Sequence, residues 1–99
     1  MTEHTITRLA REAARLADIS FEELLGPRRY KEVARVRFAV MLVARDLNYS
    51  QPDIGKRLGN RDHTTVWHGT RQAKVLLKAE DVVFAHLVAS LRKAAKDAL

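Results

Sequence analysis

The stretch SQPDIGKRLGNRDHTTVWHGTR, Ser50–Arg71, contains the start and stop signals of two helices in close succession. Its first residue, Ser50, followed three residues later by Asp53, predicts a capped helix start. Gly59 accepts a left-handed backbone and predicts the end of this short helix, and Asp62 predicts the cap of the next one. A short helix, a turn with glycine and a second helix are typical of a helix-turn-helix, which we place at about residues 50–78.

The rest of the chain also favours helix, because apolar residues recur at three- and four-residue steps and no long alternation predicts a strand. We expect helices at about residues 5–17, 21–25, 31–48, 51–58, 62–78 and 81–97. The predicted buried stripe of the first helix includes Leu16, and that of the last helix contains Val83, Leu87, Leu91 and Ala94. Residues 1–99 are therefore predicted to form one all-α domain of about five to six helices.

The charge balance indicates a polyanionic partner. Lys and Arg number 18 against 12 Asp and Glu, which gives a net charge of +6 at neutral pH. Nucleic acid is the leading partner for such a small basic domain, followed by an acidic membrane surface or an acidic protein. The sequence has no cysteine, no apolar signal core and no run long enough to span a membrane. We expect a soluble, cytoplasmic, nucleoid-associated protein without a membrane partner or small-molecule substrate.

The second helix of the motif would lie in the DNA major groove, with its N-terminal residues at the base edges. If its apolar positions face the core, the outward positions are His63, Thr64, Trp67, His68 and Arg71. Histidine and threonine can hydrogen-bond base edges, and an aspartate in the first turn can accept from a cytosine amino group. The large ring of Trp67 packs either on sugar or a thymine methyl, or back against neighbouring helices.

A basic connector precedes the longest predicted helix. Between Gly26 and the middle of that helix, the basic residues are Arg28, Arg29, Lys31, Arg35 and Arg37, against a single acid. Such a run is either a solvated face or a loop that reaches a phosphate or enters the minor groove. Arg37 and Arg45, eight residues apart on roughly one side of the helix, either bracket a phosphate backbone or form an exposed face.

The run RDHTTV, residues 61–66, resembles the signature of the C-terminal DNA-binding domain of the bacterial chromosomal replication initiator DnaA. The resemblance extends over about residues 19–77, through the stretches ISFEELL, VRFAVMLVARDL and SQPDIGKRLGNRDHTT. It implies the helix-turn-helix fold of DnaA domain IV, which is similar to that of the Trp repressor. It also implies sequence-specific binding of a short duplex element, the DnaA box.

By motif position, the resemblance implies a set of DNA contacts. The residues expected to read bases in the major groove are Pro52, Asp62, His63 and Thr64. Arg29 would enter the minor groove, and the residues expected to hold phosphates are Arg37, Arg45, Thr65 and His68. We add Arg28 and Arg71 to the phosphate set, because they are basic residues of the connector and of the outward helix face. Trp67 departs from the family, which has a smaller aliphatic residue there.

Enzymatic functions find little support in the sequence. No G-x-x-x-x-G-K-[ST] phosphate loop or G-x-S-x-G nucleophile motif occurs, so we expect no ATPase or other enzyme activity. His63 and His68 are about 140° apart on a helix, which is poor spacing for one metal, and we expect neither metal nor cofactor.

The predicted function is double-stranded DNA binding at DnaA-box-like sites, regulating replication initiation or transcription. One alternative is a transcription regulator that recruits RNA polymerase. Another is a protein-interaction module without specific DNA binding, and the replication initiator is a further possible partner.

Overall fold

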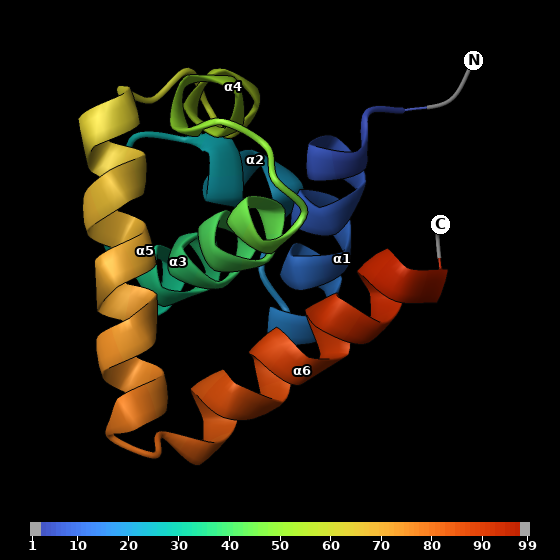
Figure 1. Ribbon diagram of the computed structural model, residues 1–99. Coiled ribbons are helices and arrows are strands. Elements are labelled where there is room, and N and C mark those ends of the chain that lie inside the picture. Colours follow the sequence, from blue (N-terminus) through green and yellow to red (C-terminus); the bar gives the residue numbers. More distant parts are fainter. Residues whose placement is uncertain (1–2, 98–99) are drawn as a thin grey trace.

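Residues 3–97, the part of the chain that the structure describes, form six α-helices in a computed structural model (Figure 1). The helices are α1 Thr5–Ala17, α2 Phe21–Leu25, α3 Lys31–Asp46, α4 Gln51–Arg57, α5 His63–Lys78 and α6 Val82–Asp97. The predicted all-α class and the number of helices are confirmed. The longest predicted helix ends two residues earlier than expected, at Asp46.

Side-chain caps fix where α4 and α5 begin. Ser50 Oγ accepts a hydrogen bond from the Asp53 N–H at 3.2 Å, and Asp62 Oδ1 accepts one from the Thr64 N–H at 3.1 Å. These bonds satisfy amide groups that have no partner within the helix. Between the two helices, Gly59 has a φ of 83°, so the predicted helix-turn-helix consists of α4, this turn and α5.

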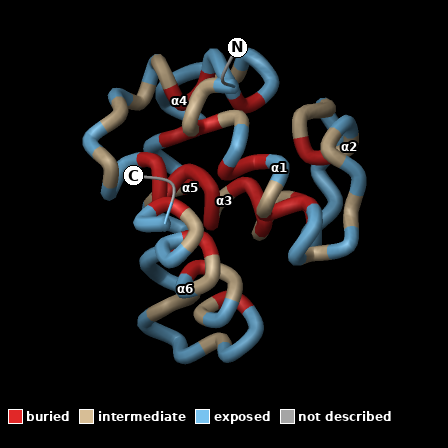
Figure 2. The backbone as a smooth tube through the Cα atoms, turned by 90° about the vertical axis from the view of Figure 1, so that its right-hand side faces the viewer, coloured by how far each residue is buried: buried red, intermediate tan, exposed pale blue. Residues whose placement is uncertain are grey.

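The core surrounds α3, which contacts every other helix. Figure 2 shows the buried residues concentrated along α3 and on the helix faces turned toward it. The most extensive contact between two helices is that of α3 with α5, where Gly69 of α5 lies against the Met41 side chain of α3. A Cβ at this glycine would overlap the Met41 sulfur, so the Met41 side chain would have to move if a larger residue stood there.

The predicted buried face of α6 is wrong at its beginning. Val83 is 81% exposed, whereas Phe84 is 3% and Val88 is 1% exposed. The helix is apolar over a wide arc, so periodicity alone allows two stripes one residue apart, and burying the large Phe84 ring removes more apolar surface from water. Leu16, predicted to be buried on α1, is also exposed.

Two further observations concern the same residues 3–97. No helix among them is both long and apolar enough to cross a membrane. No group of three or more His, Cys, Asp or Glu side chains is arranged so that it could hold a metal ion.

Candidate nucleic-acid interface

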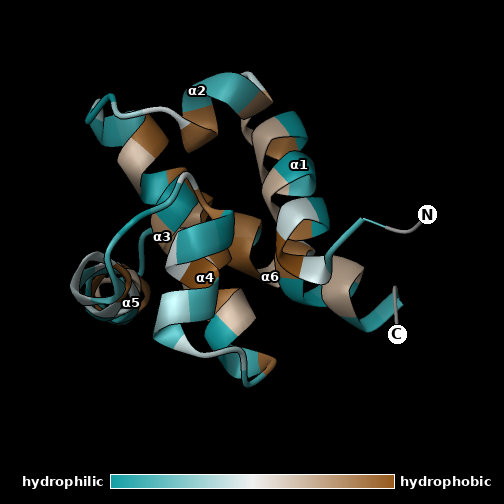
Figure 3. Ribbon diagram, turned by 90° about the horizontal axis from the view of Figure 1, so that it is seen from above, coloured by the Kyte–Doolittle hydropathy of each residue, from teal (hydrophilic) through white to brown (hydrophobic). Residues whose placement is uncertain are grey.

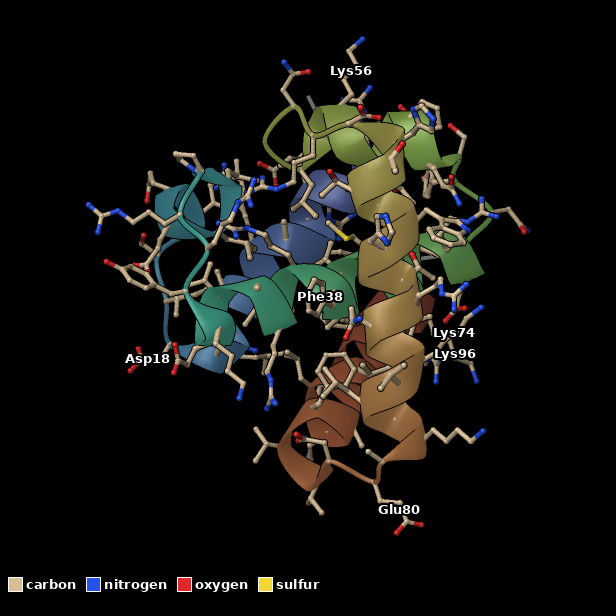
Figure 4. The ribbon with its side chains drawn as sticks, turned by 90° about the vertical axis from the view of Figure 1, so that its left-hand side faces the viewer. Asp18, Phe38, Lys56, Lys74, Glu80 and Lys96 are labelled. Atoms are coloured by element: carbon tan, nitrogen blue, oxygen red, sulfur yellow. The ribbon has the colours of Figure 1, made fainter. Side chains whose placement is uncertain are left out.

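The N-terminal half of α5 presents a polar outer surface. Asp62 and the first helical residues His63, Thr64 and Thr65 are all exposed, whereas Val66 is fully buried. Figure 4 shows α5 in front of α3, with the connector between α2 and α3 beside its upper half. The helical period thus separates core-facing residues from a free first turn, as the sequence predicts.

Asp62 orders this first turn. Its Oδ1 atom accepts from the Thr64 N–H and lies 2.9 Å from His63 Nδ1. The carboxylate therefore stabilises the positive end of α5 and holds the neighbouring imidazole ring at the same time. The side chains of Asp62 and His63, both predicted to read bases, therefore lie together at the N-terminus of α5.

Trp67 lies on the outer face of α5 and is 42% exposed. The Arg71 guanidinium stacks over its ring at 4.8 Å from the centroid, and the His68 ring meets it edge-on at 5.0 Å. These cation–π and aromatic contacts come from the same helix face. Of the two placements expected for Trp67, the structure has the exposed one, with His68 and Arg71 grouped around it.

The other predicted contacts lie on three neighbouring segments. Pro52 is exposed in the first turn of α4, and Arg29 is exposed in the α2–α3 connector. Arg28 is also exposed and donates to the Tyr30 hydroxyl at 3.0 Å. Arg45 is exposed at the end of α3 and donates to the Tyr49 carbonyl at 2.8 Å. Figure 3, which looks down α5, shows α4 next to that helix and the hydrophilic connector at the beginning of α3.

Arg37 is buried, with only 5% of its surface exposed. Its Nε donates to the Leu24 carbonyl at 2.7 Å, and its Nη1 donates to the Arg28 carbonyl at 2.6 Å. Its Nη2 donates to the carbonyls of Glu23 and Gly26, at 3.0 and 2.8 Å. The guanidinium therefore binds the end of α2 and the connector that follows it.

The expectation that Arg37 and Arg45 project together to bracket a phosphate is thus wrong for Arg37. A short helix leaves its last carbonyls without partners inside the helix, and a guanidinium is a planar group with five donors. Because α2 packs against the side of α3 that carries Arg37, the carbonyls at the end of α2 lie within reach of its guanidinium. Residue spacing along α3 does not reveal which of its sides is covered.

Arg61 plays a similar part in the turn before α5, and sequence reasoning assigned no separate role to it. Its Nη1 donates to the carbonyls of Leu58 at 2.6 Å and Leu25 at 3.3 Å, and its Nη2 donates to that of Gly26 at 2.5 Å. Burial and, next, the positive charge of Arg61 lower the pKa of Arg37 to about 10, and burial also lowers the pKa of Arg61. Two cations are therefore held close together at neutral pH.

A cleft of about 580 Å³ lies between the connector and α5. Its polar lining consists of Arg29, Arg37, Arg61, Thr65 and His68. No acidic side chain is among the described residues that line it. Because positive charge favours anions, this cleft suits a phosphate group of a nucleic-acid backbone. The donors for it are those of the exposed Arg29, Thr65 and His68, since the guanidinium groups of the other two arginines bind backbone carbonyls.

A free, polar first turn on the second helix, beside a cationic loop and cleft, defines a DNA-binding protein of the helix-turn-helix class. Residues 6–73, more than half of the chain, match the family described as the bacterial dnaA protein helix-turn-helix. The chain belongs to this family.

Several similar proteins carry the name chromosomal replication initiator protein DnaA. The protein of Caulobacter vibrioides NA1000 is 40% identical over 90 residues, which is 90% of this chain and 18% of that protein. The protein of Cereibacter sphaeroides ATCC 17029 is 38% identical over 77 residues, 77% of this chain and 17% of that protein. The protein of Ruegeria sp. TM1040 is 37% identical over 90 residues, 90% and 19% of the two chains. This chain thus spans less than a fifth of each relative.

Proposed function

We propose that this protein binds double-stranded DNA at a short DnaA-box-like element, with α5 in the major groove and Arg29 in the adjacent minor groove. The observation that carries the proposal is the placement of the exposed first turn of α5 beside a cationic loop. Membership of the DnaA helix-turn-helix family supports DNA binding as the general activity. The choice of a specific box rests on the residues of that first turn.

The base-reading set comprises Asp62, His63, Thr64 and Pro52. The imidazole and hydroxyl can hydrogen-bond base edges, the carboxylate can accept from a cytosine amino group, and the proline ring and threonine methyl suit a thymine methyl. Trp67, exposed on the same helix, adds apolar contact area. Arg29 supplies a guanidinium for a narrow, A/T-rich minor groove.

Phosphate contacts are assigned to residues that surround this set, namely Arg28, Arg45, Thr65, His68 and Arg71, all of which are exposed. Phosphate contacts fix orientation and contribute affinity without reading sequence. Arg37 is removed from this group because its guanidinium already binds four backbone carbonyls. Its part is to shape the connector that presents Arg28 and Arg29.

In the cell, occupation of such sites would regulate replication initiation or the transcription of nearby genes, at the nucleoid in the cytoplasm. A DNA-bound domain can act by excluding another protein from the site or by recruiting one. The replication initiator and RNA polymerase are the two partners that fit these routes. Mapping of bound sites in the genome would separate them, since peaks near the origin favour replication control and peaks at promoters favour transcription.

The proposal is tested by measuring binding to a duplex with a DnaA-box-like element and to a scrambled duplex at two salt concentrations. Specific reading should give a preference of about 1,000-fold or more that persists at the higher salt. Charge-only binding would weaken steeply and equally for both duplexes. An unbiased selection from random duplexes that enriched no sequence would refute the proposal.

Replacing Thr64 or His63 by alanine should cost about 1 to 3 kcal/mol of binding free energy, at one or two base positions of the element. The loss should be confined to those positions, because neither side chain supports the core. Competition binding against a set of single-base variants measures this. Thr7→Ala on α1 is the matched control and should leave the profile unchanged; a uniform loss on all sequences would contradict the base-reading roles.

A further inference from the structure

We propose that Arg61 is a positioning residue that fixes the spacing between two DNA-contacting elements, the α2–α3 connector with Arg29 and the first turn of α5. The inference rests on the proposed function, since it concerns how two readers of one duplex are held relative to each other. Its carrying observation is that a single side chain in the helix-turn-helix turn donates to carbonyls of Leu25 and Gly26, at the end of α2.

Arg61 is itself held in place by hydrogen bonds within the helix-turn-helix. Its backbone N–H donates to the Gly55 carbonyl of α4 at 2.7 Å, and its Nη1 donates to the Leu58 carbonyl at 2.6 Å. The next residue, Asp62, caps α5. Arg61 therefore joins α4, the start of α5 and the connector in one hydrogen-bonded unit.

Two glycines make room for this arrangement. A Cβ at Gly55 would overlap the Arg61 carbonyl oxygen, and a Cβ at Gly59 would overlap both the Leu25 carbonyl oxygen and the Arg61 guanidinium. Real side chains do not come so close to backbone atoms. The turn and the end of α2 are thus in direct contact, and the guanidinium lies in that contact.

The connector is held from its other side by α3. The Gly26 carbonyl accepts from Nη2 of Arg37 at 2.8 Å and from Nη2 of Arg61 at 2.5 Å, so one oxygen links the two arginines. Arg29 follows only three residues later and is exposed. Because the base of the connector is fixed on both sides, its exposed arginine has a defined position relative to α5.

A fixed position gives sensitivity to spacing on the DNA. Moving an A/T-rich flank by one base pair displaces it by about 3.4 Å along the duplex axis and turns it by about 36°. A rigidly held Arg29 would then no longer reach the narrow minor groove of the displaced flank, while α5 keeps its contacts with the bases of the core element. A freely moving connector would tolerate the shift.

The test uses three duplexes that share one core element. The first has an A/T-rich flank at the selected distance, the second has a G/C flank, and the third has the A/T flank moved outward by one base pair. The wild-type protein should bind the first about 5- to 150-fold more tightly than either of the others. In Arg61→Met the flank effect, defined as the preference for the first duplex over the third, should fall below about twofold because a loosened connector tolerates the shift, while the preference for the core over a scrambled core is kept.

Arg57→Met is the charge-matched control. Arg57 lies at the exposed end of α4, paired with Asp53 at 3.7 Å, and its removal also deletes one positive charge. The flank effect should remain as in the wild type. Arg61→Lys keeps the charge of Arg61, yet one ammonium cannot reproduce the planar set of donors, so its flank effect should also fall. The lysine variant decides the matter if the methionine variant does not fold, as monitored by circular dichroism.

The outcomes separate this inference from the proposed function. If the wild type prefers no duplex, the proposed function fails. If the wild type reads the core but no flank, or if both Arg61 variants keep the wild-type flank effect, the positioning role is overturned and major-groove reading stands. If folded Arg61 variants lose core and flank preference in equal measure, Arg61 supports the whole domain and the positioning role is likewise overturned.

Discussion

Arg37→Met should lower the free energy of unfolding by about 3 to 5 kcal/mol, a large share of the stability of a domain of this size. Methionine fills much of the space of the arginine stem but donates no hydrogen bond. The four carbonyls that the guanidinium binds, from α2 and the connector, would lose those donors in a partly buried place. Urea unfolding followed by circular dichroism measures the change.

Arg45→Met is the comparison variant for this experiment, because both arginines lie on α3 and only Arg45 is exposed. It should change the free energy of unfolding by about 0.5 kcal/mol or less and should reduce the salt dependence of DNA binding by about one unit. An Arg37→Met protein as stable as the wild type would contradict the structural role assigned to Arg37.

Gly59→Ala should lower the free energy of unfolding by about 2 to 5 kcal/mol. About 1 to 2 kcal/mol comes from placing a side chain at a φ of 83°, and about 1 to 3 kcal/mol from the overlap of its Cβ with the Leu25 carbonyl oxygen. The turn would have to move away from α2, which also displaces the N-terminus of α5. Thermal and urea unfolding give the size of the loss.

Gly26→Ala is the matched control, since the residue lies on the opposite side of the same contact. Its φ is −75°, a conformation that any residue adopts, and an added Cβ would lie 3.1 Å from the Glu22 carbonyl oxygen. The loss should therefore be clearly smaller than at Gly59. Equal losses in the two variants would show that the left-handed backbone and the contact with α2 do not set the requirement for glycine.

Much of the fold follows from local signals in the sequence. Ser50 and Asp62 predict the two helix starts because a cap bonds to an amide only two or three residues away. The exposed first turn of α5 follows from the helical period, which turns Val66 inward. These interactions need no partner from elsewhere in the chain.

The same local signals are insufficient where a helix has more than one apolar side. On α6 the series through Val83 and the series through Phe84 are both compatible with burial, and packing against the rest of the core selected the second. Burial of the larger Phe84 ring against the core, and not the period, makes that choice.

The sequence alone therefore indicates an all-α helix-turn-helix protein of the DnaA kind and predicts which residues in the first turn of α5 are exposed. The roles of Arg37 and Arg61 depend on the three-dimensional packing, because their carbonyl partners lie up to 36 residues away. A guanidinium on a helix or in a turn looks the same in sequence whether it faces a phosphate or the end of a neighbouring helix. Because α2 packs against α3 and against the turn before α5, the guanidinium groups of Arg37 and Arg61 contact the backbone of the α2–α3 connector. Arg28 and Arg29, on the same connector, remain exposed.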